Sequence, residues 1–503
     1  MRRAALTALL LTLLLLVPAG SASASGPTIL GAGSTWVQIA LDQWRADASR
    51  QGLSINYQGV GSTAGRQFFI INQVDFAASE IPFLPEELAQ LRSKHKHFQY
   101  LPDVAGGTAL MYNLKDASGH QVNNLRLSAP TIAKIFTGQI TSWNDPAIKA
   151  DNPGLHLPSQ HLTPVIRSDG SGTSAKLADY LAHEAPSIWN PFAAQNSVTL
   201  PVQFWPNLPG MVAVRGSDGM ANYISNLSVG SGSIGYVEAG YVYEHSMTPV
   251  YIRNASGNYA SPSSTNVAVA LRHATLNRDL TQNLLGVYNA PETNAYPLAS
   301  YSYLITQTTG FDPAKGAVLG KWIIYIACAG QKEAAPLGYS PLSPNLVKDV
   351  FAAVRRIPGA PAPPPLTASA CPNPTITGQG YGGSPGDNNP TSGPPSGGSG
   401  ATPTTHSGNG GGKPTKAAKT AMTSQPIDAA TAAALGQPSA LTVTPLTEGQ
   451  RRAAYVAALS AAKQLDPEST SSALLTAAVL ALVLLGPLAV AARRRPSPGG
   501  ADV

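Results

Sequence analysis

The sequence has little cysteine and little charge, and each shortage argues against a class of protein. Its 503 residues include two cysteines and only 12% charged residues, with a net charge of +6. No stripe of Lys and Arg with interleaved aromatic residues occurs, which argues against nucleic-acid binding. The nine histidines lack the spacing of metal ligands, so we expect no metal site.

Common catalytic and cofactor motifs are also missing. The run Gly170-Ser171-Gly172 lacks the G-x-S-x-G spacing of a nucleophile elbow. Gly59, Gly61 and Gly65 do not match the G-x-G-x-x-G pattern of dinucleotide binding. No constellation of His and Cys suited to nucleophilic catalysis accompanies these glycines. We therefore expect no catalytic residue, no enzymatic activity and no cofactor.

What the sequence does contain includes two apolar segments near its ends. Residues 1–24 combine Arg2-Arg3, an apolar run and a small-residue cleavage site, which is typical of a secretory signal peptide. Residues 473–492 are uncharged and mostly apolar, and the tail 493–503 begins with three arginines. This pattern predicts a transmembrane helix with its positive end in the cytoplasm. We expect an exported protein, anchored in the cell membrane, with residues 25–472 outside.

Between these segments the character of the chain changes near residue 358. Residues 27–358 alternate strand-like runs with helix-like periodic segments, which predicts an α/β domain with largely parallel sheets. Residues 359–447 are rich in Pro, Gly, Ser and Thr, a composition that predicts a disordered linker. Residues 448–465 regain helical periodicity and predict a juxtamembrane helix.

The two cysteines are Cys328 and Cys371. In an exported protein such a pair is more typical of a disulfide than of a metal site or a nucleophile. The chain entropy removed by closing a loop of this length corresponds to a stabilisation of roughly 4 kcal/mol. We therefore predict a Cys328–Cys371 disulfide.

Turns rich in Gly, Ser and Thr follow strand-like runs and open helix-like segments. Three such turns lie at residues 31–36, 57–65 and 167–174. A turn of this kind leaves backbone N–H groups at a helix N-terminus, where the helix dipole adds positive potential. Arg167 adds a forked, charged donor, Asp169 is placed to hold it, and a strand ending at Glu80 adds a carboxylate. Each turn alone also fits an ordinary connection, but together they predict one site for a tetrahedral oxyanion.

The segment after the first turn carries apolar residues at helical spacing. Thr35 and Gln38 fit a capping box, which predicts a helix that begins at this turn.

These turns resemble the ligand loops of the phosphate-binding proteins that serve high-affinity bacterial phosphate ABC transporters. The resemblance covers roughly residues 28–345 and is carried by Gly31–Trp36, Tyr57–Gly65, Val74–Pro82, Ile135–Asp145, Arg167–Thr173, Gly216–Gly219, Ser233–Glu238 and Pro297–Ile305. It implies a two-lobed type II periplasmic binding protein fold, a Venus flytrap that closes over one dianion. Lobe I would comprise residues 27–105 and 296–358, and lobe II residues 106–295.

The same resemblance implies which residues would hold inorganic phosphate. They are Thr35, Trp36, Ser62, Glu80, Arg167, Ser171, Gly172 and Thr173. Asp169 would orient Arg167. The sequence departs from the family pattern at Trp36, where Phe is usual, and at Glu80, where Asp is usual.

The leading functional hypothesis is a receptor that binds phosphate outside the membrane and delivers it to the permease subunits of an ABC transporter. The alternative is a tethered phosphate sensor or surface-interaction protein that is not coupled to transport. An extracellular phosphohydrolase would need a metal cluster or an activated nucleophile, and the sequence offers neither.

Overall fold

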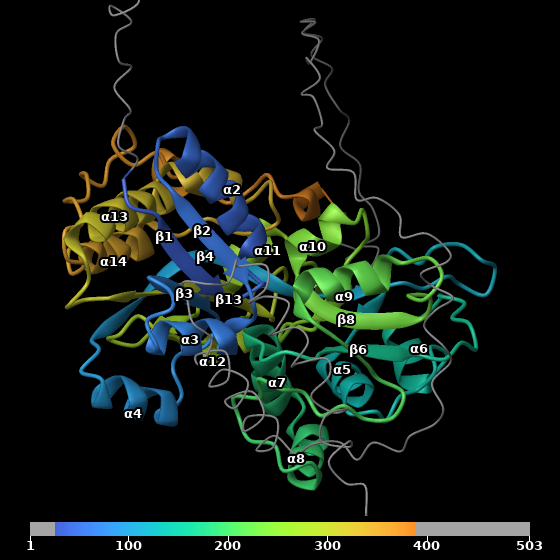
Figure 1. Cartoon of the computed structure of the whole chain (residues 1–503). Helices are drawn as coiled ribbons and strands as arrows, with labels where there is room; N and C mark the ends of the chain where they lie inside the picture. The colour runs from blue at the N-terminus through green and yellow to red at the C-terminus, as the bar shows by residue number, and fades with distance from the viewer. Residues whose placement is uncertain (1–25, 389–503) are drawn as a thin grey trace, which may run out of the picture. The chain divides into compact units, whose positions relative to one another are not determined.

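The computed structural model describes residues 26–388, and its first elements alternate between strand and helix as the sequence predicts (Figure 1). These elements are β1 (Ile29–Gly33), α2 (Gln38–Arg50), β2 (Ile55–Gly59), α3 (Ser62–Ile70), β3 (Phe76–Ser79), α4 (Pro85–Ser93) and the long strand β4 (Phe98–Tyr112). Strand β3 is buried along its whole length, as a strand covered on both faces requires.

The next elements lie in the part of the chain that the family resemblance assigns to lobe II. Its elements are β5 (Arg126–Leu127), α5 (Ala129–Phe136), α6 (Pro146–Asp151), β6 (Thr163–Arg167), α7 (Gly172–Glu184), α8 (Pro186–Gln195), β7 (Val212–Val214), α9 (Gly216–Ser225), β8 (Ser233–Glu238), α10 (Ala239–Glu244), β9 (Tyr251–Arg253), β10 (Tyr259–Ala260), α11 (Ser264–Leu271), β11 (Thr275–Leu276), β12 (Gln282–Asn283) and α12 (Leu285–Tyr288).

The chain then enters the second segment that the resemblance assigns to lobe I. The last described elements are β13 (Ala299–Gln307), α13 (Pro313–Ala327), the 3₁₀ helix η2 (Ala329–Glu333), α14 (Pro344–Val354), α15 (Pro374–Thr377) and the 3₁₀ helix η3 (Pro385–Asn388). In Figure 1, β1 to β3 with α13 and α14 lie at the left, and β6, β8, α5, α6 and α9 lie at the right.

The principal sheet has the strand order β2-β1-β3-β13-β4-β8-β6-β7. The outer strands pair in parallel, β1 with β2 and β3, and β6 with β7 and β8. The central strands are antiparallel, because β13 runs against both β3 and β4, and β4 runs against β8. The sheet is therefore parallel at both ends and antiparallel in its centre, which matches the predicted largely parallel sheet only in part.

Strand β4 is common to both lobes. Residues Phe98–Gly107 pair with β13, and residues Thr108–Tyr112 pair with β8. The change of partner falls between Gly107 and Thr108, and the family resemblance implies a lobe boundary between residues 105 and 106. A Cβ atom on Gly106 would lie 2.6 Å from the indole ring of Trp36, so glycine lets that ring pack on the strand.

The pairing of β4 with β13 is interrupted by a β-bulge. The register passes from Tyr303 opposite Pro102 to Tyr301 opposite Ala105, so Asp103 and Val104 share one opposing residue, Ser302. A bulge of this kind bends the strand and redirects its side chains. Here it brings a buried carboxylate, that of Asp103, to the row occupied by Ser302.

The helix after the first turn begins later than the capping box predicts. Helix α2 starts at Gln38, its N-cap is Val37, and no side chain caps it. The predicted capping box is therefore wrong, and the reason is a competing partner: Thr35 Oγ1 lies 2.9 Å from Ser217 Oγ, in lobe II.

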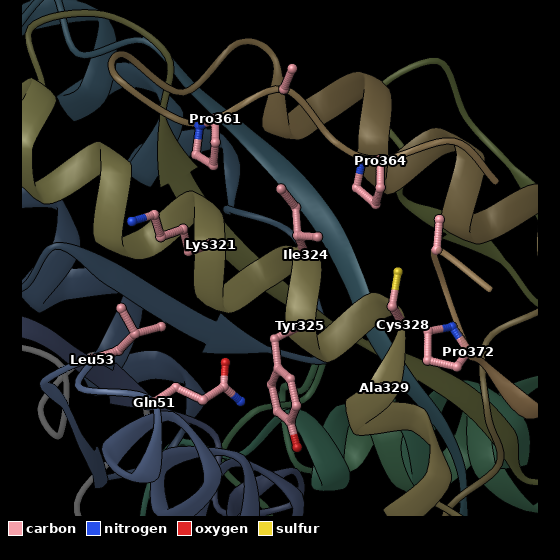
Figure 2. A pocket seen from close by; sticks show the side chains of 12 residues that line it. Gln51, Leu53, Lys321, Ile324, Tyr325, Cys328, Ala329, Pro361, Pro364 and Pro372 are labelled. Carbon is pink, nitrogen blue, oxygen red and sulfur yellow. The ribbon is translucent and has the colours of Figure 1, made fainter. Parts of the chain in front are cut away.

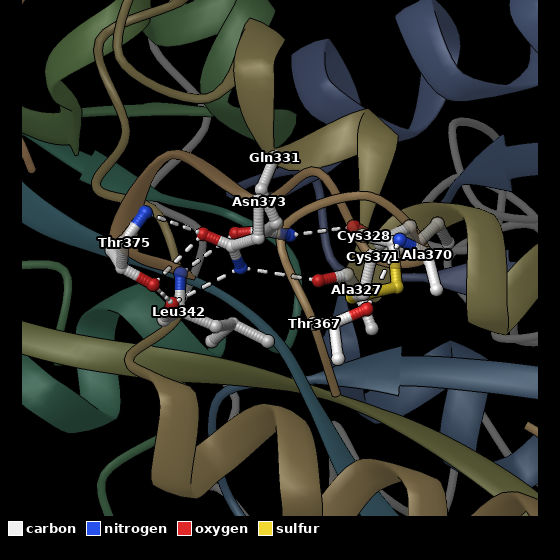
Figure 3. Close-up of a disulfide and its surroundings, with 10 residues drawn as sticks. Ala327, Cys328, Gln331, Leu342, Thr367, Ala370, Cys371, Asn373 and Thr375 are labelled. Carbon is white, nitrogen blue, oxygen red and sulfur yellow. Dashed lines mark hydrogen bonds between the residues drawn. A yellow bond between two sulfur atoms is a disulfide. The ribbon is translucent and has the colours of Figure 1, made fainter. Parts of the chain in front are cut away.

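The packed domain continues past the predicted boundary at residue 358. Asn373 is buried, and its Nδ2 donates to the carbonyl oxygens of Ala327 and Leu342 at 3.1 and 3.2 Å (Figure 3). Further on, the backbone N–H of Ser264, at the start of α11, donates to Ser384 Oγ at 3.1 Å. Residues 359–388 thus form a strap along the domain rather than part of a linker, because their polar groups find partners on α13 and α11.

Cys328 and Cys371 form the predicted disulfide, which fixes this strap to the end of α13 (Figure 3). Both cysteines are buried. The predicted signal peptide 1–24, the rest of the predicted linker to 447, the helix 448–465 and the transmembrane segment 473–492 lie outside the described residues. Within residues 26–388, no helix combines the length and the hydrophobicity needed to cross a membrane.

We predict that replacing both cysteines, Cys328→Ser with Cys371→Ser, lowers the free energy of unfolding by about 2–4 kcal/mol, since the long loop is no longer closed in the unfolded chain. Denaturant unfolding of the purified protein measures this difference. Wild-type protein under reducing conditions should match the double variant, which should itself be insensitive to reductant. Equal stability of the oxidised and reduced wild type would contradict the prediction.

Candidate anion-binding site

Three buried tyrosines donate hydrogen bonds to the backbone of the turn between β1 and α2. The carbonyl oxygens of the three consecutive residues Ser34–Trp36 each accept a hydrogen bond from a phenol hydroxyl. In order along the turn, the donors are Tyr57 at 2.7 Å, Tyr241 at 2.6 Å and Tyr339 at 2.6 Å. Burial raises the pKa of all three phenols, so they remain neutral donors. Because three consecutive carbonyls of the turn are bound in this way, its conformation is fixed.

The Thr35 side chain on this turn reaches lobe II. Ser217, in the first turn of α9, donates its backbone N–H to Thr35 Oγ1 at 3.0 Å, and the two hydroxyls lie 2.9 Å apart. Arg167 Nη1 in turn donates to Ser217 Oγ at 3.4 Å. Thr35 from lobe I and Arg167 from lobe II are therefore joined through one serine.

Arg167 ends strand β6 and is paired with Asp169. Its Nε donates to Asp169 Oδ1 at 2.7 Å, and a second bond joins Nη2 to Oδ2, so the pair is bidentate. Gly216 adds a backbone N–H to Oδ1 at 3.0 Å. Burial alone would raise the pKa of Asp169, but the charge and hydrogen bonds of Arg167 outweigh it and hold the pKa below its usual value. Asp169 thus stays ionised and fixes the plane of the guanidinium.

Ser62, Glu80 and Gly172 meet at the contact between the lobes. Ser62 Oγ donates to Glu80 Oε2 at 2.9 Å and accepts the backbone N–H of Gly172 at 3.2 Å. Ser62 begins α3 and Gly172 begins α7, so the N-termini of two helices converge on this point. A Cβ on Gly172 would lie 2.2 Å from Glu80 Oε2, so only glycine permits the approach.

Glu80 has an electrostatic environment opposite to that of Asp169. Its side chain is fully buried at the end of β3, and burial raises its pKa, against the effect of hydrogen bonds from Ser34 and Ser62 and the charge of Arg167. A carboxylate in such a place is a strong acceptor for any ligand that carries a proton.

The remaining predicted residues lie around the same point. Ser171 Oγ accepts the backbone N–H of Ser174 at 3.2 Å and so caps α7, and Thr173 is buried in the first turn of that helix. The backbone N–H of Trp36 donates to Ser34 Oγ at 2.9 Å, and its indole N–H donates to Thr108 Oγ1 at 3.2 Å.

Sequence reasoning missed several residues that connect this site. Ser217 falls in a segment that carries the family resemblance, Gly216–Gly219, but no pattern singled it out. Gln203 accepts a hydrogen bond from Thr63 Oγ1 at 2.6 Å across the lobes, and nothing in its surrounding sequence indicates this. Ser302, which donates to Glu80 Oε1 at 3.4 Å, is recognisable only from strand register.

No group of three or more His, Cys, Asp or Glu side chains within residues 26–388 could hold a metal ion. A pocket of about 510 Å³ lies elsewhere, between α13 and the strap, and is lined by Leu53, Lys321, Tyr325, Pro361 and Pro372 among others (Figure 2). None of the predicted phosphate ligands lines this pocket. The chemistry of the site is therefore that of hydrogen-bond donors, one guanidinium and one acceptor carboxylate, which suits a tetrahedral oxyanion.

Comparison with known proteins gives consistent matches over the same region. A model of the PBP superfamily domain matches residues 18–352. The phosphate-binding protein PstS of Xylella fastidiosa (strain 9a5c) is 33% identical over 325 residues, which is 64% of this chain and 84% of that protein. Phosphate-binding protein PstS 3 of Mycobacterium tuberculosis (strain H37Rv) is 30% identical over 313 residues, 61% of this chain and 80% of the relative.

A solved structure supports the fold. The structure of a high affinity periplasmic phosphate-binding protein bound with phosphate superposes with a TM-score of 0.51 at 20% sequence identity, covering 65% of this chain and 93% of that one. At this level of identity the likeness concerns the fold alone.

The two carboxylates of the site should affect stability with opposite signs. Asp169→Asn should lower the free energy of unfolding by about 3–5 kcal/mol, because it leaves the buried Arg167 without its counter-charge. Glu80→Gln should raise it at neutral pH in ligand-free protein, because Glu80 has a raised pKa and its ionised form is costly to bury.

Denaturant unfolding as a function of pH tests both signs. The contribution of Asp169 to the free energy of unfolding is fully present above the pKa that Asp169 has in the unfolded chain. It is lost as the pH falls through the lowered pKa of Asp169 in the folded protein. Ionised Glu80 lowers the free energy of unfolding once the pH rises above the pKa that Glu80 has in the unfolded chain. The increase in stability from Glu80→Gln should therefore vanish in acid. A loss of stability in Glu80→Gln at neutral pH would contradict this assignment.

Proposed function

The chain belongs to the PBP superfamily and, within it, to the family of the PstS phosphate-binding proteins, and on this premise we propose that it is a receptor for inorganic phosphate. It binds the anion between its two lobes outside the cytoplasm and delivers it to the permease of an ABC transporter. The protein stays attached to the membrane through residues 473–492, and its action is binding without catalysis.

The observation that carries the proposal is the junction of Ser62, Glu80 and Gly172 beside the Arg167–Asp169 pair. Ser62 and Glu80 come from lobe I, and Gly172 and Arg167 come from lobe II. A phosphate bound there would draw donors from both lobes at once, so its binding would favour the closed arrangement of the lobes.

Each predicted ligand has a distinct part in this proposal. Arg167 supplies the positive charge, and Asp169 holds its fork in one plane. The donors are hydroxyl and backbone N–H groups at the starts of helices or of the fixed first turn. They comprise Thr35, Trp36, Ser62, Ser171, Gly172 and Thr173. Glu80 is the acceptor, and near neutral pH it takes a hydrogen bond from the proton that phosphate carries.

We predict that Arg167→Ala weakens phosphate binding by at least about 2 kcal/mol, or roughly thirtyfold, because a charge-assisted bidentate donor is lost from a buried site. Arg167→Lys should recover only part of the loss, since an ammonium group cannot reproduce the fork. Titration calorimetry of the purified protein with phosphate measures both.

The exposed arginine Arg50 offers a control, and Arg50→Ala should leave the affinity unchanged. An Arg167→Ala loss below tenfold would remove Arg167 from the site. Phosphate uptake by cells that carry only the Arg167→Ala protein should fall in parallel. Normal uptake together with lost binding would exclude delivery to a permease and favour the sensor alternative.

Glu80 should decide between phosphate and sulfate. Both are tetrahedral dianions, but only phosphate carries a proton near neutral pH, so sulfate would leave the Glu80 carboxylate unpaired and repelled. A buried group left without its partner rejects the wrong ligand by up to about 10⁴–10⁵. We expect Glu80→Gln to narrow the phosphate-over-sulfate preference by at least about tenfold, and Glu80→Asp to keep most of it.

Competition binding at neutral pH gives this ratio directly. Equal affinity of the wild type for both anions, or an unchanged ratio in Glu80→Gln, would show that another residue discriminates between them.

A further inference from the structure

Glu80, Ser302 and Asp103 form one row across three neighbouring strands. On β13, Tyr303 is opposite Ser79 of β3 on one side and Pro102 of β4 on the other. The next position on each strand therefore places Ser302 between Glu80 and Asp103. Neighbouring strands lie about 4.8 Å apart, so one small hydroxyl side chain spans the gap between the two carboxyl groups.

Asp103 is a buried carboxyl group with half of its hydrogen bonds missing. Its residue is 1% exposed, and its Oδ1 accepts the backbone N–H of Val104 at 2.8 Å. Its Oδ2 is buried and has no hydrogen-bond partner. An ionised carboxylate oxygen in this position would pay the full cost of desolvation, whereas a protonated one would become a donor.

The hydrogen bonds between Glu80, Ser302 and Asp103 depend on the protons available to them. A serine hydroxyl has one hydrogen to donate and two lone pairs that accept. The Ser302 hydroxyl lies 3.4 Å from Glu80 Oε1 and donates to it. The lone pairs of Ser302 are then available to a donor on its other side, where Asp103 lies. A proton on Asp103 Oδ2 would give that oxygen a hydrogen to donate toward Ser302, and this would extend the hydrogen bonds from Glu80 through Ser302 to Asp103.

We propose that Asp103 is kept neutral and donates through the Ser302 hydroxyl to Glu80, so that Glu80 remains the ionised acceptor in the site. Asp103 is thus a positioning residue that sets the pH range over which phosphate is preferred to sulfate. This inference rests on the proposed function for its consequence, but the protonation of Asp103 can be measured without any ligand.

The other groups that face the row favour this placement of the proton. Burial raises the pKa of Glu80 as well, but hydrogen bonds from Ser34 and Ser62 and the charges of Arg167 and Lys176 oppose this and favour its ionised form. Asp103 has the backbone N–H of Val104 and the shared Ser302, and burial together with the nearby charge of Glu80 raises its pKa. Tyr57 interacts with both carboxyl groups, but its hydroxyl donates to the Ser34 carbonyl and its pKa is raised by burial. The proton therefore resides on Asp103.

Infrared spectroscopy of the purified full-length protein tests the protonation state directly. We expect the carbonyl stretching band of a protonated carboxylic acid at neutral pH, and we expect Asp103→Asn to lower its intensity, while the part due to the buried Glu238, whose pKa burial also raises, remains. Absence of this band from the wild type, or equal intensity in the wild type and Asp103→Asn, would overturn the proposal. Because no ligand is present, this result is independent of whether the protein binds phosphate.

The pH dependence of anion selectivity tests the link to Glu80. Loss of the hydrogen bond from Ser302 raises the pKa of Glu80, so Ser302→Ala should move the pH at which phosphate preference is lost upward by about one unit. Asp103→Ala should move it in the same direction. Asp103→Asn should keep the pH at which phosphate preference is lost at its wild-type value, since the amide nitrogen of Asn donates where the protonated Oδ2 does.

Ser300→Ala is the matched control, because Ser300 precedes Ser302 by two residues on the same strand and its hydroxyl has no hydrogen-bond partner. This variant should keep the wild-type profile. A downward shift in Asp103→Asn would show that Asp103 was charged, and an upward shift like that of Asp103→Ala would show that it is not a donor. Either result, or an unshifted Ser302→Ala, would overturn the proposal. Failure of the wild type to bind phosphate at all would instead refute the proposed function, while the infrared band would still report on Asp103.

Discussion

The antiparallel pairing of β13 with its two neighbours is the constraint on which the candidate site depends. Strand β13 lies between β3, which ends next to Glu80, and β4, which carries Asp103. Strand β4 then continues without a break to pair with β8, and β8 is adjacent to β6, which ends at Arg167. Because β4 is continuous, the sheet sets the positions of Glu80 and Arg167 relative to each other, although they lie far apart in the sequence. The glycine at position 106 keeps this strand thin enough for the Trp36 ring to pack on it.

The surroundings of Glu80 and Asp169 shift the pKa values of these two carboxylates in opposite directions. Asp169 faces a guanidinium in bidentate geometry, which holds its pKa below the usual value, so it acts as a fixed counter-charge. Glu80 is surrounded mainly by hydroxyls in a buried position, so its charge is costly and sensitive to each donor around it. The pairing of Asp169 with Arg167 makes the site rigid, whereas the charge of Glu80 responds to changes in its hydrogen-bond donors. A receptor for an anion that itself carries a proton needs both properties.

The parts of the site that could be predicted from the sequence are those set by local chemistry. The turns at 31–36, 57–65 and 167–174 were recognisable because Gly, Ser and Thr at a helix start have a direct backbone meaning. The Arg167 and Asp169 pair was accessible for the same reason, since the two residues lie two positions apart. The disulfide followed from the count of cysteines and the expected export.

What could not be predicted depends on partners that are distant in sequence. Thr35 fits a capping box locally, yet its hydroxyl bonds to Ser217, 182 positions away, because that contact is available only after both lobes have folded. The bulge that turns Asp103 toward Ser302 is a matter of strand register, which no local pattern encodes. The sequence also predicts an end of the domain at residue 358, which is too early, because a polar, proline-rich segment packs well once Asn373 finds two carbonyl partners.

The attachment of the strap has a mechanical consequence. Tension applied at residue 388 would first act on the contacts of Ser384 with α11, and then on the covalent bond at Cys371. The disulfide transfers that load directly into α13, so the chain between Cys328 and Cys371 carries none of it. The load path thus ends in the outer layer of lobe I and bypasses the strands β4 and β13. A pull on the C-terminal end of the described domain would therefore reach α13 without loading the central strands of the sheet.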